Sequence, residues 1–88
     1  MEIEFKETAL RDIEYFKRYG NKSIRNKIDT LLLSILQTPF NGIGKPEPLK
    51  GDLSGYWSRR INIEHRMVYT VTKTTITIHS LRGHYNKK

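Results

Sequence analysis

Residues 56–82 read YWSRRINIEHRMVYTVTKTTITIHSLR, and this stretch decides the fold. Apolar β-branched and aromatic residues alternate with polar ones, a period of two that is typical of strands with one buried face. The pattern predicts three strands, at about Tyr56–Ile63, Arg66–Thr72 and Thr75–Arg82. Short turns join them, so neighbouring strands are expected to pair in antiparallel fashion.

Two segments upstream have helical spacing. The first runs from Glu7 to Tyr19, and Gly20 is expected to end it. Asn21 is a suitable cap for a second helix, which Pro39 ends because the residue before a proline avoids helical geometry. The apolar positions that set the spacing are Ala9, Leu10, Ile13, Phe16, Ile24, Ile28, Leu31, Leu32, Ile35 and Leu36.

The order of elements predicts the fold class. Ile3 and Phe5 alternate with acidic residues, which predicts a short first strand. Residues 40–55 are rich in glycine and proline and are expected to form a loop. Helices followed by hairpin-linked strands indicate an α+β fold, with a helical hairpin on one face of an antiparallel sheet. We expect one domain over residues 1–88, since the chain is too short for a second core.

Strand register decides where the arginines lie. Arg59, Arg60 and Arg66 fall on adjacent strands, and Arg59 shares the helix-facing side with Trp57. If the loop after the first of these strands has an odd number of residues, such as three around Ile63–His65, Arg60 and Arg66 share the open face. An even loop would instead place Arg60 in the core, which is costly for a charge.

Composition restricts the function classes. The net charge of +7 and the pI near 9.9 favour a polyanionic partner, either nucleic acid or an acidic protein. The absence of cysteine excludes disulfides and thiol nucleophiles. The N-terminus MEIEFKETAL lacks the apolar core of a signal peptide, and the three dispersed histidines have no metal-ligand spacing. We expect a soluble cytoplasmic protein without a metal or other cofactor.

One loop carboxylate has an unusual setting. Glu47 lies between Pro46 and Pro48, with Lys45 and Lys50 nearby to favour its ionised form. A carboxylate can act as a base towards the ribose 2′-hydroxyl of RNA.

The other groups needed for RNA cleavage occur further along the chain. Arg60 and Arg66 can clamp a phosphate, and Lys50 can hold the RNA backbone. His84 can protonate the leaving oxygen, and Tyr85 can stack on a base. Each of these residues has a plain alternative as a solvated or packing side chain. His65, in the predicted turn, and His79, within a strand, are weaker candidates.

Two other functions remain open from the residues. The same basic face would suit a non-catalytic module that binds ribosomal RNA or an acidic protein. A DNA-binding regulator ranks lower, because the second helix has basic residues at one end only, at Lys22, Arg25 and Lys27.

Three motifs carry a resemblance to a known family. KPEPLKGDLSGYWSRRI (45–61), EHRMVY (64–69) and the closing GHY (83–85) resemble the YoeB/Txe branch of the RelE-like toxins of bacterial toxin–antitoxin pairs. The resemblance covers nearly the whole chain, including TPF (38–40). It implies a microbial-ribonuclease-like α+β fold, with helices on one face of a twisted antiparallel sheet.

The resemblance also implies an activity. Such toxins are endoribonucleases that cut mRNA in the ribosomal A site without a metal, and an acidic YefM/Phd-like antitoxin holds them inactive. By position, the general base falls on Glu47, the transition-state arginine on Arg66 and the general acid on His84. Further active-site positions fall on Lys50, Arg60 and Tyr85. A homodimer is an open alternative to a monomer.

This sequence departs from the family pattern at its end. Gly83 stands where a larger residue is usual, and residues 86–88 extend beyond Tyr85. A regular last strand would turn His84 towards the core, and Gly83 could supply a bend that redirects it.

Overall fold

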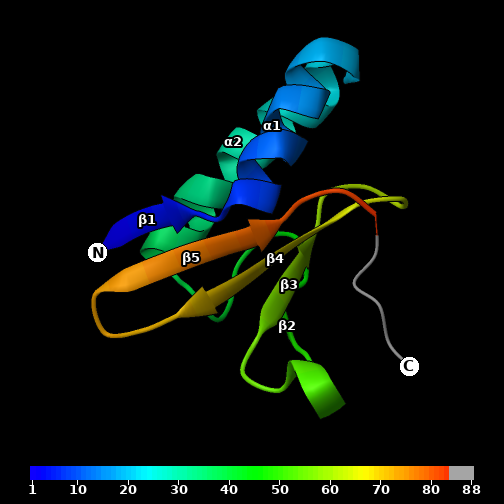
Figure 1. The fold of residues 1–88 in the computed structure, drawn as a ribbon. Helices are drawn as coiled ribbons and strands as arrows, with labels where there is room; N and C mark the ends of the chain where they lie inside the picture. Colours follow the sequence, from blue (N-terminus) through cyan, green and yellow to red (C-terminus); the bar gives the residue numbers. More distant parts are fainter. Residues whose placement is uncertain (84–88) are drawn as a thin grey trace.

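The fold has two helices against one sheet. The structure, a computed structural model, describes residues 1–83. Both helices pack on the same face of the sheet (Figure 1), which confirms the predicted α+β architecture. The elements in chain order are β1 (Glu2–Phe5), α1 (Glu7–Tyr19), α2 (Lys22–Gln37), β2 (Glu47–Pro48), a 3-10 helix (Gly51–Leu53), β3 (Trp57–Arg60), β4 (Arg66–Val71) and β5 (Thr75–Ser80).

The sheet is mixed rather than purely antiparallel. Its strand order is β1-β5-β4-β3-β2, and β1 runs parallel to β5 while the other neighbours are antiparallel. A parallel pair requires a crossover connection, and the two helices lie between β1 and the other strands in the chain. The two-residue strand β2 lies within the segment that the sequence predicted as a loop.

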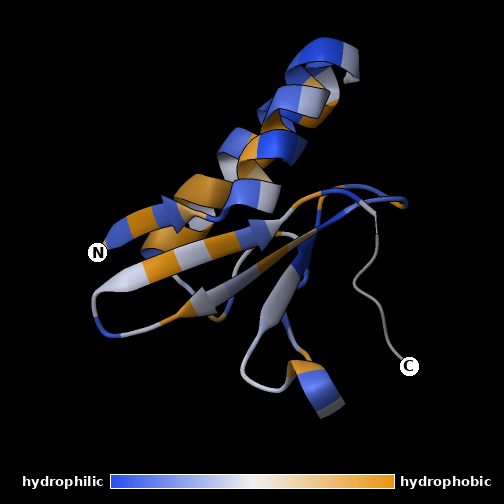
Figure 2. Cartoon of the chain, viewed as in Figure 1, coloured by the Kyte–Doolittle hydropathy of each residue, from blue (hydrophilic) through white to orange (hydrophobic). Residues whose placement is uncertain are grey.

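The two helices begin and end close to the predicted residues. The Asn21 side chain accepts a hydrogen bond of 2.8 Å from the backbone N–H of Ile24, so it caps α2 as expected. Thr38 ends α2 directly before Pro39. Alternating hydrophobic and hydrophilic bands mark β5 (Figure 2), and its Ile76 and Ile78 are fully buried beneath the helices.

The buried face of α1 differs from the predicted apolar stripe. Leu10 is 53% exposed, whereas Asp12 is 7% exposed and Ala9 and Phe16 are buried. The helix is therefore rotated so that a carboxylate enters the interior. The Asp12 carboxylate accepts backbone hydrogen bonds there, which offset the cost of its burial.

The register of β3 and β4 places two arginines side by side. Arg60 and Arg66 are paired across the two strands, as the predicted odd loop requires. The Ile61 N–H donates to the carbonyl oxygen of His65, which leaves residues 62–64 at the tip of the turn. Ile63 is 88% exposed at this tip, within the predicted loop around Ile63–His65, and β3 ends at Arg60, before the predicted strand end at Ile63.

A β-bulge interrupts β5 before the chain leaves the sheet. Tyr69 of β4 pairs with Ile78, but its neighbour Val68 pairs with Ser80, so His79 is an extra residue on β5. The extra residue reverses the alternation of faces, and Leu81 is fully buried. The regular strand that would have turned residue 84 towards the core is therefore not present.

Arg59 is a structural residue and not part of an exposed arginine cluster. It is fully buried and donates five hydrogen bonds, which use all the donors of a guanidinium. Its acceptors are the Tyr69 hydroxyl (3.0 Å), the Ser34 hydroxyl (2.8 Å) and the carbonyl oxygens of Ile43 (3.1 Å), Thr38 (2.6 Å) and Asn41 (2.8 Å). Together these contacts hold the segment after α2 against the sheet.

The segment around this guanidinium approaches it too closely for side chains. Gly42 and Gly44 have φ values of +117° and +81°, which favour glycine. A Cβ at Gly42 would lie 2.7 Å from the Ser34 hydroxyl oxygen, and one at Gly44 would lie 2.7 Å from a Leu31 methyl carbon. Glycine is therefore required here by both space and backbone conformation.

Tyr69 completes this arrangement. Its hydroxyl accepts from Arg59 and donates to the Pro39 carbonyl oxygen at 2.8 Å. Burial raises the pKa of Tyr69, against an opposing effect of Arg59, so the phenol keeps the proton that it donates.

We predict that Arg59→Met lowers the free energy of unfolding by about 3–5 kcal/mol, because it leaves several buried acceptors without a donor. Arg59→Lys keeps the charge but has fewer donors, so it should restore only part of this loss. Urea unfolding measures both variants. Arg60→Gln is the matched control, since Arg60 is exposed and its loss should change stability by about 0.5 kcal/mol or less. Equal stability of Arg59→Met and Arg60→Gln would contradict this structural role.

Candidate functional site

Glu47 and Arg66 meet on the side of the sheet opposite the helices. Glu47 lies on β2 and Arg66 on β4, with β3 between them. The Arg66 Nη2 atom is 3.8 Å from the Glu47 Oε1 atom. A second guanidinium nitrogen, Nη1, donates to the Ser58 hydroxyl oxygen at 3.2 Å. The sheet therefore brings together two of the predicted catalytic residues from segments 19 positions apart in the chain.

The two partners differ in their exposure. The Arg66 side chain is 14% exposed, whereas the Glu47 side chain is 51% exposed. Ser58 is fully buried beneath the pair and fixes one side of the guanidinium. A contact of 3.8 Å to a half-exposed carboxylate is a weak ion pair that an incoming anion can displace. Nη1 of Arg66 is thus held by Ser58, while Nη2 can change its partner from Glu47 to an incoming anion.

Two of the predicted substrate-binding residues are Arg60, at the end of β3, and Lys50, in the segment after Glu47. Arg60 is exposed, and its backbone pairs with that of Arg66. Its N–H also donates to the Gly44 carbonyl oxygen at 2.7 Å, which ties the Glu47 loop to the end of β3. Lys50 is exposed directly before the 3-10 helix.

His84 and Tyr85 lie outside the described residues, so the predicted acid and stacking residue have no described position. The chain leading to them is described as far as Gly83. The Arg66 N–H donates to the Gly83 carbonyl oxygen at 3.0 Å, which places the residue before His84 directly beside Arg66.

Sequence reasoning missed two residues of this region. The Ser58 hydroxyl accepts a hydrogen bond from Arg66. The available signal was that Ser58 lies two residues before Arg60 and so shares its strand face. The Asp12 carboxylate accepts hydrogen bonds from the backbone after β5. The available signal was its spacing, since Asp12 lies three residues after Ala9 and four before Phe16 and so shares their helix face.

The two histidines rated as weaker candidates have distinct places. The His65 ring packs edge-on against Phe16, with ring centroids 5.1 Å apart, and its Nδ1 atom accepts a hydrogen bond from Gly83. His79 contacts the Thr70 hydroxyl at 3.0 Å, and its ring packs against Tyr56 in a tilted arrangement, with ring centroids 4.8 Å apart. Burial lowers the pKa of His79, and the charge of Lys6 lowers it further.

The described residues offer neither a metal site nor a membrane-spanning helix. Residues 1–83 contain no group of three or more histidine, aspartate or glutamate side chains that could hold a metal ion. Within these residues, neither helix combines the length and the apolarity needed to span a membrane.

Structural comparison first defines the class of protein. The chain superimposes on a YoeB/ParE toxin from Agrobacterium tumefaciens with a TM-score of 0.91 and 41% identity, covering 97% of this chain and all of that one. The YoeB dimer of Staphylococcus aureus gives a TM-score of 0.87 at 48% identity, covering 97% and 98%. A heterotetrameric YoeB–YefM toxin–antitoxin complex from Staphylococcus aureus gives a TM-score of 0.84 at 49% identity, covering 94% and 95%. The chain therefore has the fold of the YoeB class of bacterial toxins.

Sequence comparison identifies the family. Residues 5–85 match the family described as YoeB-like toxin of bacterial type II toxin–antitoxin system. The chain is 48% identical over 87 residues to toxin YoeB of a Synechocystis strain, covering 99% of this chain and all of that protein. The chain therefore belongs to the YoeB family of type II toxin–antitoxin toxins, which confirms the resemblance predicted from the motifs.

The lowered pKa of His79 predicts a pH dependence of stability. Between its folded pKa and the ordinary value of 6.5, the unfolded chain binds a proton that the native state excludes. The contribution of His79 is therefore present above pH 6.5 and is lost as the pH falls through this window. We expect acidification from about pH 7.5 to 5 to destabilise the wild type more than His79→Gln. Urea midpoints at each pH measure this, and parallel curves for the two proteins would contradict it.

Proposed function

We propose that this toxin is an endoribonuclease that cuts mRNA in the ribosomal A site and thereby inhibits translation. The observation that carries the proposal is the contact between Glu47 and Arg66, at 3.8 Å, on the side of the sheet away from the helices. It joins a half-exposed carboxylate to a guanidinium that is already fixed by Ser58. Membership of the YoeB family supports the same assignment.

The Glu47 carboxylate would act as the general base. When the scissile phosphate arrives, Arg66 transfers its contact from the carboxylate to a non-bridging phosphate oxygen, because a guanidinium binds both anions by the same geometry. Glu47 is then free to take the proton from the ribose 2′-hydroxyl. The 2′-oxygen attacks phosphorus, and a 2′,3′-cyclic phosphate forms as the bond to the 5′-oxygen breaks.

Arg66 and His84 would complete the reaction. Arg66 stabilises the negative charge that gathers on the phosphate oxygens in the transition state. His84, in its protonated form, gives a proton to the departing 5′-oxygen. Each proton-transfer group is expected to contribute about 10²–10⁴-fold to the rate.

The remaining residues would bind the substrate. Arg60, next to Arg66 on the adjacent strand, can hold a neighbouring phosphate, and Lys50 can hold the RNA backbone. Tyr85 would stack on an unpaired base beside the cut. The net charge of +7 favours both the mRNA and ribosomal RNA as partners.

A YefM-type antitoxin would mask this site in the cytoplasm, where ribosomes and mRNA are present. The support is the Staphylococcus aureus relative, a YoeB toxin in complex with YefM. An acidic segment that folds on binding suits a cationic surface such as the one around Arg60 and Arg66. The dimer of that relative supports a homodimer as a second assembly.

We predict that wild-type protein cuts mRNA in a reconstituted translation reaction only when ribosomes are present. Glu47→Ala, Arg66→Ala and His84→Ala should each slow cleavage by about 10²–10⁴-fold, because each removes a group that acts in the chemical step. Primer extension locates and quantifies the cuts. Glu14→Ala is the matched control, since Glu14 is an exposed carboxylate on α1, and this variant should cut as fast as wild type.

Two results would count against the proposal. Wild-type rates in Glu47→Ala or Arg66→Ala would contradict the assignment of the site. Ribosome binding by the wild type without cuts in any reaction would contradict nuclease activity and would favour the non-catalytic binding module.

A further inference from the structure

The chain after β5 is held by side chains of α1 although it has no regular secondary structure. Asp12 Oδ2 accepts hydrogen bonds from the backbone N–H groups of Leu81 (2.8 Å) and Arg82 (3.1 Å). The Arg82 guanidinium carbon lies 3.6 Å from the centre of the Tyr15 ring, one helical turn from Asp12. Leu81 is fully buried. The path of residues 81 and 82 is thus set by α1.

Gly83 is held by the turn between β3 and β4. Its N–H donates to His65 Nδ1 at 2.7 Å, and its carbonyl oxygen accepts from the Arg66 N–H at 3.0 Å. Gly83 has a φ of +70°, and within the described residues no atom lies within 4 Å of where its Cβ would be. Hydrogen bonds rather than side-chain packing therefore fix this residue.

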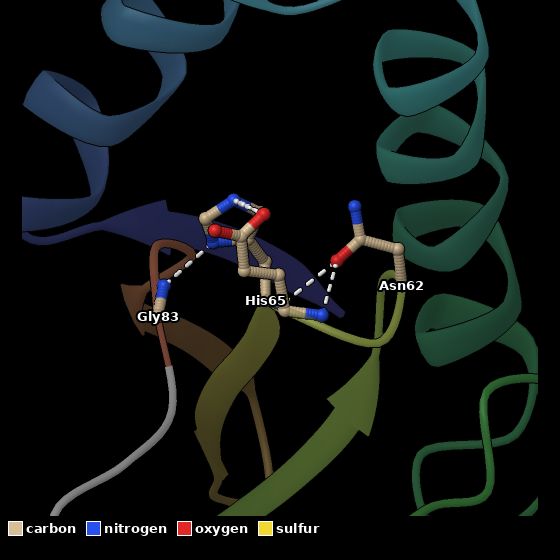
Figure 3. A network of polar contacts seen from close by, with 4 residues as sticks. Asn62, His65 and Gly83 are labelled. Atoms are coloured by element: carbon tan, nitrogen blue, oxygen red, sulfur yellow. Dashed lines mark hydrogen bonds and ion pairs between the residues drawn. The ribbon is translucent and has the colours of Figure 1, made fainter.

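The His65 ring is itself fixed in place. The Asn62 side-chain oxygen accepts from the backbone N–H groups of His65 (2.7 Å) and Glu64 (2.8 Å), which shapes the turn that presents the ring to Gly83 (Figure 3). The ring packs against Phe16, and the His65 side chain is only 15% exposed.

The contacts of His65 also define its tautomer. Because Nδ1 accepts the bond from Gly83, it carries no proton, and the ring proton lies on Nε2. Nε2 faces the Glu64 carboxylate at 3.6 Å, which favours this arrangement. The ring is therefore oriented by its hydrogen bond at Nδ1 and by its contact with Phe16.

We propose that His65 is a positioning residue for the general acid, acting through Gly83. His84 follows Gly83 directly in the sequence, and the two hydrogen bonds of Gly83 hold the residue before the acid beside Arg66. This role rests on the proposed function, in which His84 protonates the leaving oxygen. A small displacement of a catalytic group lowers the rate steeply, which is why an anchor one residue away affects cleavage.

Two substitutions at His65 separate the hydrogen bond from the ring. His65→Phe keeps a ring against Phe16 but offers no acceptor to Gly83. His65→Asn places a side-chain oxygen near the position of Nδ1 but removes the ring. A purely structural role through packing predicts that His65→Phe is the better tolerated variant, whereas the positioning role predicts the reverse.

The first measurement is the rate of amide hydrogen exchange at Gly83, monitored by NMR on the full-length protein. The exchange should be slow in wild type and His65→Asn, and roughly tenfold faster in His65→Phe. Unchanged exchange in His65→Phe would overturn the proposal, because it would show that the His65 acceptor does not hold Gly83. This measurement does not depend on nuclease activity.

The second measurement is single-turnover cleavage of ribosome-bound mRNA. His65→Phe should slow cleavage by about 10–100-fold without weakening mRNA binding, and His65→Asn should recover most of this rate. In a His84→Ala background, His65→Phe should cause no further loss, because the residue that it positions is already absent.

Three cleavage results would overturn the positioning role. In the first, His65→Phe lowers the cleavage rate by the same factor in the wild-type and His84→Ala backgrounds. In the second, His65→Asn cleaves as slowly as His65→Phe. A wild-type rate in His84→Ala would remove the acid assignment and the positioning role with it. In that last case, slow exchange at Gly83 would still demonstrate the hydrogen bond to His65, so the two failures are distinguishable.

Discussion

The buried guanidinium of Arg59 is the interaction on which the rest of the structure depends. It carries a full charge into the interior with no carboxylate among its five acceptors. Two hydroxyls and three carbonyl oxygens satisfy it, and the oxygens at the carboxyl end of α2 add the negative end of the helix dipole. Because these acceptors come from α2, β4 and the loop after α2, the charge can be buried only when all three are assembled. This requirement sets the starting point of the segment that leads to Glu47.

Strand β3 has a different function on each of its faces. Arg59 points towards the helices and stabilises the fold, while its neighbour Arg60 is exposed on the opposite side and pairs with Arg66. The period of two along a strand makes this division possible between adjacent residues of the same type. Arg66 then links the parts of the site, since its side chain contacts Glu47 and its backbone binds Gly83.

The sequence predicted what depends on periodicity and local chemistry. The helix caps, the three main strands and the pairing of Arg60 with Arg66 all follow from spacing and loop parity. The sequence did not reveal features that depend on partners distant in the chain. The fixed path of residues 81 and 82 requires Asp12, which lies about seventy positions away, and the bulge at His79 is a property of the pairing with β4. Neither leaves a periodic signal.

The two ends of the candidate site are held differently from its centre. Hydrogen bonds to backbone groups, from other backbone groups and from the Asp12 and His65 side chains, fix the loop before Glu47 and the segment ending at Gly83, and such bonds do not exchange when a charged substrate arrives. The Glu47–Arg66 contact is long and partly exposed, so a phosphate can replace it. In the proposed mechanism the segments that must stay in place are held through their backbone groups, and the one contact that must break is a weak ion pair. A shorter, fully buried pair at this position would oppose both substrate binding and proton transfer to Glu47.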